Sequence, residues 1–362
     1  MGKNKKILSL LLVMLLVFGV VAPAGAVEPK KALQDYFIES MTRDTADVYS
    51  AMSKGQLRIE KIAFNPQKNG KTDSFSEALT EHLNNSVLDY NISFDIKNRK
   101  ARVSLLFSNS RLKLPLIFYI MEKQLIVDLD SLRKSVAQID PEIAAQLPAD
   151  RQYLVNTSKD EEELFTFWND LEKAQKDSKL DAKSQEAVAD MIGLLVTSLP
   201  DKTVKVFDQQ DVGVQIRHDD LLPLLSSLIQ VVAENPDKVS KFYNNWKNRS
   251  SLPVQNASID ESLNPADVKK SLEELRKEMD RSFHLNEYTL IKGPKEGNRF
   301  RSLNRIDIEI FDNGDRSTGG QFCIELENWD ENNPTFDFSF PTLTDSNQIT
   351  FEELDRQSAK KR

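Results

Sequence analysis

The spacing of hydrophobic positions changes three times along the chain, and each change predicts a different kind of secondary structure. An apolar stripe at helical spacing, formed by Leu33, Phe37 and Met41, predicts an opening helix over residues 29–40. Alternating apolar and polar positions then predict strands over residues 55–157, and helical spacing returns over residues 158–283. The alternation resumes over residues 284–341, so the chain is expected to contain two strand blocks separated by helices.

The first strand block is rich in β-branched and aromatic residues, and its strands are spaced like hairpins. This pattern favours an antiparallel meander. The predicted strands cover residues 57–62, 87–96, 102–107, 112–121, 125–129 and 153–155.

The helical block contains residues that commonly begin helices. Asn235-Pro236 and Asn264-Pro265 each place a capping Asn before a Pro at the first helical position, and Asp219 or Asp220 can cap another helix. Two short predicted strands interrupt this block at residues 204–207 and 212–216.

The second strand block contains a clear hairpin signal. Residues 312–315, Asp-Asn-Gly-Asp, predict a type I′ turn because both central residues accept positive φ. One extra residue at Gly319-Gly320, a β-bulge, would place Ile306 beside Phe322 on the same face. The predicted strands of this block cover residues 287–291, 300–311, 321–327 and 335–340.

These elements predict an α+β fold in which a curved, half-barrel-like antiparallel sheet packs against a block of helices. Neither strand block has an obvious separate partner for its apolar face, so residues 27–345 are predicted to form one domain. Two domains divided near residue 158 or 284 are the alternative. Residues 346–362 are predicted to form a polar C-terminal tail.

The N-terminus has the three parts of a secretory signal peptide. Lysines within the first six residues precede an apolar run at residues 7–21, and Ala24 and Ala26 occupy the −3 and −1 positions of a cleavage site. An uncleaved membrane anchor is the alternative, but the run is shorter than the roughly 20 residues that a spanning helix needs. We therefore expect residues 1–26 to be removed, leaving a secreted or cell-wall-associated protein without a membrane span.

The charge of the chain argues against nucleic acid and anionic membrane surfaces as partners. The chain has 48 basic and 56 acidic residues, and its net charge of −8 becomes −11 once the three signal-peptide lysines are lost. The basic residues are scattered, and they form no patch that would attract phosphate groups.

The residues that carry catalytic chemistry are sparse. His82, His218 and His284 are the only histidines, and no Gly-x-Ser-x-Gly turn accompanies them, so a Ser-His-Asp system is not indicated. The single cysteine, Cys323, lacks a neighbouring His or cationic run that would lower its pKa, and we interpret it as a small residue beneath a covering helix.

Acidic pairs are frequent in this chain, and three of them have spacings that could hold a cation. None approaches the spacing of a calcium loop, so we interpret them as solvated surface and expect neither a metal nor a cofactor. The three pairs are Asp128 with Asp130, Asp312 with Asp315, and Asp330 with Glu331.

The central strands 112–121 and 125–129 carry apolar residues on both faces, although a sheet with one wet face should alternate cleanly. Either helices cover both faces, or one face lines an apolar cavity. The cavity hypothesis predicts an apolar groove for a ligand, with the candidate residues Leu116, Phe118, Ile120, Tyr119 and Ile126.

Three stretches resemble a known family: residues 115–129, residues 212–222 with the following helix, and residues 338–344. They are similar to the lipoprotein-carrier superfamily typified by LolA and LppX, and to secreted envelope proteins of Gram-positive spore-forming bacteria. The resemblance implies a half-barrel sheet wrapped against helices around an apolar groove for lipid or acyl chains. It implies no catalytic residues, and the lipidated members' anchoring cysteine is not present here.

The expected function is a secreted, non-enzymatic binding protein of the bacterial envelope that holds a lipid or other apolar ligand. A structural or protein-interaction module of the envelope is the first alternative. A hydrolase that uses His218 is the second.

Overall fold

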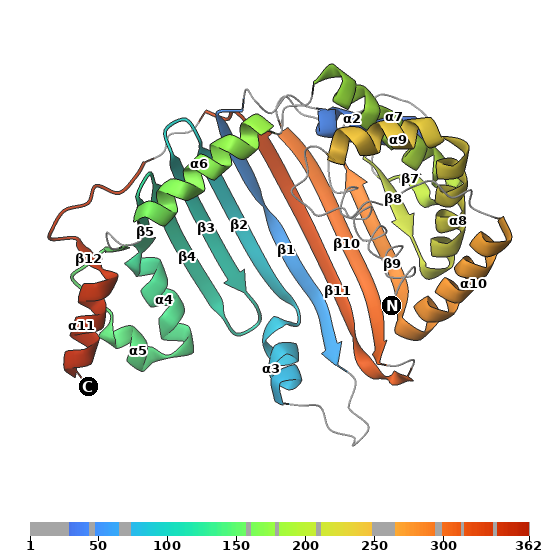
Figure 1. The fold of residues 1–362 in the computed structure, drawn as a ribbon. Helices are drawn as coiled ribbons and strands as arrows, with labels where there is room; N and C mark the ends of the chain where they lie inside the picture. Colours follow the sequence, from blue (N-terminus) through green and yellow to red (C-terminus); the bar gives the residue numbers. More distant parts are fainter. Residues whose placement is uncertain are drawn as a thin grey trace.

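The computed structural model describes residues 29–42, 48–64, 74–156, 161–177, 181–207, 211–247, 265–293, 299–312, 315–335 and 339–361. The predicted signal peptide, with Ala24 and Ala26, lies outside these residues. All the strands of the described part belong to one 12-stranded sheet (Figure 1).

The strand order across the sheet is β12-β6-β5-β4-β3-β2-β1-β11-β10-β9-β8-β7, and only β12 and β6 pair in parallel. The sheet is open, because its edge strands β12 and β7 lie at opposite ends. The strands are β1 (Ser50–Phe64), β2 (Ser86–Asp95), β3 (Lys100–Ser108), β4 (Lys113–Met121), β5 (Gln124–Asp128), β6 (Tyr153–Val155), β7 (Val204–Val206), β8 (Val212–Ile216), β9 (Phe283–Lys292), β10 (Arg299–Asp312), β11 (Asp315–Asn332) and β12 (Gln348–Thr350).

Helices follow both strand blocks and separate them in the sequence. The helices are α2 (Pro29–Thr42), α3 (Ser74–Leu83), α4 (Leu129–Ile139), α5 (Pro141–Gln146), α6 (Glu161–Asp177), α7 (Ala182–Ser198), α8 (His218–Glu234), α9 (Pro236–Lys247), α10 (Pro265–Ser282) and α11 (Phe351–Lys361). None of the helices described is long and apolar enough to cross a membrane.

Strand β1 lies in the middle of the sheet and joins its two halves (Figure 1). It pairs antiparallel with β2 along residues 50–59 and with β11 along residues 51–64. The two predicted strand blocks therefore form one continuous sheet, and the predicted α+β class, an antiparallel sheet packed against helices, is confirmed.

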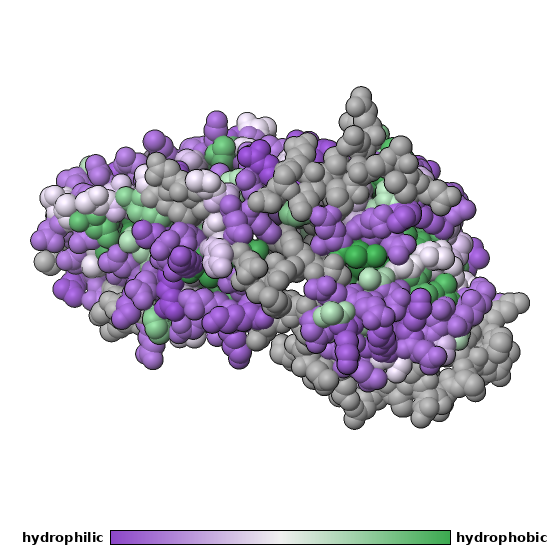
Figure 2. Space-filling view, turned by 90° about the horizontal axis from the view of Figure 1, so that it is seen from above, coloured by the Kyte–Doolittle hydropathy of each residue, from purple (hydrophilic) through white to green (hydrophobic). Residues whose placement is uncertain are grey.

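Alternation along the strands gives the sheet two faces of different composition. On one face, here called the apolar face, Leu57 of β1 lies beside Leu88 of β2 and Leu326 of β11. On the opposite face, here called the charged face, Arg58 of β1 lies beside Glu325 of β11, with 3.5 Å between the guanidinium and the carboxylate. Seen from above, hydrophilic residues dominate the surface and apolar residues form small separate patches (Figure 2).

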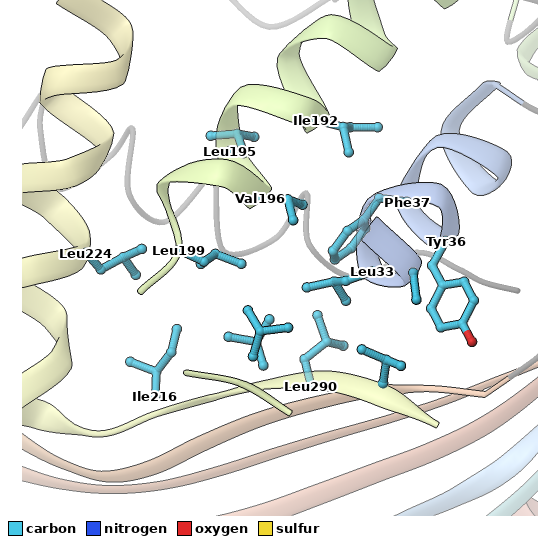
Figure 3. Close-up of a cluster of buried hydrophobic side chains, with 14 of the residues drawn as sticks. Leu33, Tyr36, Phe37, Ile192, Leu195, Val196, Leu199, Ile216, Leu224 and Leu290 are labelled. Carbon is cyan, nitrogen blue, oxygen red and sulfur yellow. The ribbon is translucent and has the colours of Figure 1, made fainter. Parts of the chain in front are cut away.

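Helices α2, α7 and α8 seal the apolar face at the β7–β9 end of the sheet (Figure 3). Leu33 and Phe37 of α2 and Leu195 of α7 are buried in one cluster with Ile216 of β8 and Leu290 of β9. Because Leu33 and Phe37 belong to the predicted apolar stripe, the opening helix and its inward face are both confirmed.

A smaller core seals the other end of the same face. Leu154 of β6 and Ile349 of β12 are buried with Leu129, and Leu132 of α4 and Leu354 of α11 pack against them. Helix α6 crosses β2–β5 in Figure 1, and its Trp168 has no exposed surface. Apart from α6 and from α3, which contacts β1, the helices gather at the two ends of the sheet.

Most predicted helices occur where the sequence places them, and Pro236 and Pro265 are the first residues of α9 and α10. The prediction that Asp219 or Asp220 caps α8 is wrong, because this helix already begins at His218. Asp220 lies in the first turn, where its carboxylate accepts the Arg217 N–H at 2.9 Å.

Two predictions near the C-terminus differ from the structure. In the predicted strand 335–340, Thr335, Ser339 and Phe340 lie outside any strand, and residues 336–338 are outside the described part of the chain. The Phe340 ring packs against Tyr119 of the charged face with 5.7 Å between ring centroids. Residues 346–362 are not a tail, because they contain β12 and α11. Their few apolar residues, such as Ile349, are too widely spaced to form a clear stripe in the sequence.

Asp312 pairs with Asp315, as a hairpin between β10 and β11 requires. Asn313 and Gly314, on which the predicted type I′ turn depends, lie outside the described residues. The predicted irregularity near Gly319 is present, and this glycine has φ of 101°, which an L side chain rarely adopts. The register between β10 and β11 shifts there by more than the one residue predicted. Ile306 therefore pairs with Ile324 and not with Phe322.

Helix α4 takes the place of a strand along part of β4. Strand β5 pairs only with residues 118–121 of β4, so residues 113–117 have no strand beside them on that side. An uncovered strand edge of this kind can pair with another chain. Here α4 covers it.

The covering contacts come from three polar side chains at helical spacing, which lie one above the other on one face of α4. They bond the backbone groups of β4 that a further strand would otherwise bond. The contacts join Ser131 Oγ to the Ile117 N–H (3.1 Å), Ser135 Oγ to the Pro115 carbonyl, and the Gln138 amide to the N–H and carbonyl of Lys113.

Replacing Ser135 and Gln138 together by alanine should lower the free energy of unfolding by about 1–3 kcal/mol, since two to three edge hydrogen bonds are lost. Urea unfolding followed by circular dichroism measures this change. Lys134→Ala is the control because Lys134 is exposed on the same helix. An equal loss in both variants would contradict an edge-covering role for α4.

Candidate functional site

Between the two sealed ends, the apolar face carries a group of side chains that we call the apolar floor. Its members are apolar side chains of five neighbouring strands that cross-strand pairing brings together. They are Leu326 of β11, Leu57 of β1, Leu88 of β2, Leu105 and Phe107 of β3, and Leu114 and Leu116 of β4. Every one of these seven side chains is only half-buried, whereas Val212, Val214 and Leu290 at the β7–β9 end are buried. The apolar floor is therefore a contiguous apolar surface that the helices leave partly open.

The structure divides the five predicted groove residues between the two faces. Leu116, Phe118 and Ile120 lie on the apolar face, because they alternate along β4 and pair with Leu105, Val103 and Ala101 of β3. Tyr119 and Ile126 are direct cross-strand partners on the charged face.

Burial separates these five residues further. Ile126 is fully buried, and the other four residues are half-buried. Only Leu116, Phe118 and Ile120 can line one groove together, because they share the apolar face. Of these three, Leu116 belongs to the apolar floor.

A group of polar residues, which we call the polar island, interrupts the apolar face next to the floor. It consists of Ser53 of β1, Tyr90 of β2, Lys292 of β9, Ser302 of β10, and Asn328 and Asp330 of β11. Cross-strand pairs place these residues in two adjacent rows. The first row crosses five strands, in the order Tyr90, Gly55, Asn328, Ser302 and Lys292. The second row is the pair of Ser53 with Asp330.

Hydrogen bonds connect the members of the island. Ser302 Oγ donates to the Asn328 side-chain carbonyl, and Asn328 Nδ2 donates to Asp330 Oδ2 at 2.7 Å. Tyr90 hydrogen-bonds with Ser53, while burial and the Asp330 carboxylate raise the pKa of the Tyr90 hydroxyl. The chain of bonds ends on the Asp330 carboxylate, which Asn328 separates from the floor residue Leu326 along β11.

Lys292 has no exposed surface. Burial lowers the pKa of its ammonium group to about 8, and the nearby Asp330 carboxylate partly opposes this change. The small side chain of Ser302 on the intervening strand leaves room for the long lysine to extend toward β11.

Gly55 leaves space for the Tyr90 hydroxyl on the apolar face. A Cβ atom built on Gly55 would lie 2.8 Å from Tyr90 Oη and 2.0 Å from the Glu327 carbonyl oxygen. The absence of a side chain therefore lets Tyr90 lean across β1 toward the island on β11.

Two pockets meet at His218 and Asp219, at the start of α8. One pocket, of about 440 Å³, lies against α10 and has Leu272 and Met279 in its wall. The other, of about 380 Å³, opens toward the charged face and is lined in part by Arg305. A histidine at such a junction is the arrangement that the hydrolase hypothesis requires.

Both ring nitrogens of His218 already have partners. The Leu285 N–H approaches Nδ1 at 3.3 Å, and a backbone amide can only donate, so Nδ1 accepts. Nε2 therefore carries the proton and donates to Asp280 at 2.8 Å. The ring also stacks on His284 with 4.8 Å between centroids. Neither nitrogen is left to accept a proton from a nucleophile.

The other two histidines lie apart from one another. His82 is exposed in the last turn of α3, and His284 is half-buried against His218 in the wall of the second pocket.

Cys323 is buried on the charged face of β11, beneath side chains and not beneath the helix that was predicted. Its Sγ donates to Glu60 Oε2 at 3.0 Å, and Arg305 contacts both of these groups. Burial, followed by the hydrogen bond to Glu60, raises the pKa of the thiol to about 12. The residue remains a protonated thiol at neutral pH.

Among the described residues, no group of His, Cys, Asp and Glu is arranged for a metal, and the side chain of Asp312 lies outside them. Asp128 caps α4 by accepting the Ser131 N–H at 2.7 Å, and Asp130 pairs with Arg133. Asp330 and its neighbour Glu331 point to opposite faces.

Compared with protein-family models, with curated proteins and with solved structures, the chain matches none of them. The resemblance to lipoprotein carriers rests on the sequence patterns alone.

The polar island was missed in the sequence, although β11 carries a signal for it. Ile324 and Leu326 are followed at the same two-residue spacing by Asn328, Asp330 and Asn332. A change from apolar to polar residues along one face of a strand indicates a local change of environment, and β10 repeats it at residues 302–308.

Alkylation of Cys323 by iodoacetamide at pH 8 should be at least about a hundredfold slower in the folded protein than in urea, because little thiolate exists when the pKa is near 12. Mass spectrometry of the alkylated peptide measures the two rates. Ser110→Cys in a Cys323→Ser background places a thiol at an exposed position and should react rapidly. A native Cys323 as reactive as this control would contradict its protonated state.

The pH dependence of stability should report the buried Lys292. Its pKa is about 8 in the folded protein and 10.5 in the unfolded chain, so the unfolded state binds more protons between these values. The free energy of unfolding should therefore rise by roughly 2 kcal/mol between pH 7.5 and 9.5, relative to Lys292→Met. Urea titrations at the two pH values measure this difference, and parallel curves for the two proteins would contradict it.

Proposed function

We propose that this protein is a secreted, non-enzymatic binding protein of the bacterial cell envelope, and that the apolar floor holds an acyl chain or a similar apolar ligand. The observation that carries the proposal is the half-buried state of the floor, which continues the face that helices seal at both ends. The signal-peptide pattern and the resemblance to lipoprotein carriers supply the location.

The energetics of such binding are adequate for a lipid. Covering about 200–300 Å² of acyl surface contributes about 5–7 kcal/mol before the entropic terms of association, at roughly 25 cal/mol per Å². Binding of this kind needs apolar area and no catalytic group.

A protein-interaction module is the second candidate, because an edge strand remains available in the described part of the sheet. Strand β7 pairs there only with β8, and the side chain of its Val206 is 55% exposed. An edge of this kind can accept a strand from a partner. A hydrolase is less well supported, since His218 has no nitrogen left for a nucleophile.

The apolar floor should bind 1,6-diphenylhexatriene, a fluorophore without a polar group, and Leu105→Gln should weaken this binding about tenfold because it places an amide on the floor. Fluorescence titration of the purified protein measures the affinity. Leu106→Gln is the matched control, since Leu106 is also half-buried but lies on the opposite face of the same strand.

Native mass spectrometry of the protein as purified gives an independent measurement. A protein without bound lipid that also fails to bind the fluorophore would contradict the proposed function. Equal losses in the Leu105 and Leu106 variants would instead indicate a general effect on folding.

A further inference from the structure

Lys292 and Asp330 are the only charged residues on the apolar face in the regular, described part of the sheet. The charged face of the same strands carries many, including Arg58, Glu325 and Arg305. Removing a charge from water is unfavourable, so such groups are retained where they have a specific partner or task.

The members of the island differ in their access to the floor. Lys292 and Ser302 are buried, whereas Tyr90, Asn328 and Asp330 are half-buried. Tyr90 and Asn328 border floor residues, and Asp330 lies next to Asn328, one position further along the same face of β11. Asn328 is next to Leu326 on the same face of β11, and Tyr90 is next to Leu88 on β2. A molecule lying on the floor would therefore meet the second group of side chains.

We propose that the polar island is the headgroup subsite of the apolar floor, and that the ligand is a neutral amphiphile with hydroxyl groups on its head, as in a monoacylglycerol. Its acyl chain lies on the floor, and a hydroxyl donates to Asp330. This inference rests on the proposed function, because without a chain on the floor the headgroup has no reason to be there.

Hydroxyl groups fit the chemistry of the island because its accessible groups are mainly acceptors. Asp330 Oδ2 accepts from Asn328, and an ionised carboxylate can accept further hydrogen bonds. The hydroxyls of Tyr90 and Ser53 can accept as well. Hydrogen bonds to a charged group are stronger than those between neutral groups, so Asp330 should dominate recognition.

The charge balance of the island favours a neutral head. The Lys292 ammonium and the Asp330 carboxylate attract one another, which is the reason that Asp330 opposes the loss of the lysine's proton. An added cation would be attracted by Asp330 but repelled by Lys292, and the reverse holds for an added anion, so neither gains a net attraction from the pair. A hydroxyl binds without adding charge.

The experiment is displacement of 1,6-diphenylhexatriene from the full chain by three ligands with the same oleoyl chain: monooleoylglycerol, methyl oleate and oleate. We expect monooleoylglycerol to displace the fluorophore at a concentration about tenfold lower than methyl oleate, since only the former donates hydroxyl hydrogen bonds. Oleate should be weaker than monooleoylglycerol.

Asp330→Asn keeps the size of the side chain and removes its charge, and it should abolish the tenfold preference while fluorophore binding stays unchanged. Asp307→Asn is the matched control, because Asp307 is a half-buried strand aspartate on the charged face. It should keep the preference. Urea unfolding of both variants establishes that each one is folded under the assay conditions.

The outcomes separate the two proposals. A fluorophore that does not bind the wild-type protein overturns the proposed function and the headgroup subsite together. A fluorophore that binds, with equal displacement by monooleoylglycerol and methyl oleate or with stronger displacement by oleate, overturns the headgroup subsite alone. Retention of the preference in Asp330→Asn also overturns it and leaves the island a structural role.

Discussion

The pairing of β1 with β11 is the interaction on which the rest of the structure depends. Residues 51–64 pair with residues 320–332, so strands from opposite ends of the sequence share one ladder. This pairing fixes the register between the two halves and makes their apolar faces one surface. The helices can then seal that surface at both ends, and the partly open floor remains between them.

Local patterns of the sequence were sufficient for most strands and for the central helices, because period and capping residues act over short distances. They could not give the strand order, since nothing near β1 in the sequence specifies β11 as its neighbour. Helix α4 was missed because it follows β5 without a loop, so its first residue, Leu129, reads as the end of the strand, although Leu129, Leu132 and Val136 have helical spacing. The edge-bonding role of Ser131, Ser135 and Gln138 depends on the position of β4, which a helical pattern does not reveal.

The candidate site was predictable only in part. Alternation along residues 112–121 indicated two apolar faces, and this strand does carry floor residue Leu116. Alternation alone does not indicate which face the helices leave open, so the predicted groove combines Tyr119 and Ile126 with residues of the other face. The polar island draws on five strands, β1, β2, β9, β10 and β11, and such a group is assembled only when the sheet forms.

The central position of β1 also has a consequence for the order in which the molecule can be assembled. During synthesis from the N-terminus, one edge of β1 stays unpaired until β11 is made, roughly 260 residues later. Contacts so distant in sequence form slowly. Until then its backbone groups and the neighbouring leucines stay uncovered, a condition that promotes aggregation of partly folded chains. We therefore expect the N-terminal half of the nascent chain to depend on chaperone binding, or on staying unfolded, until β10 and β11 have been synthesised.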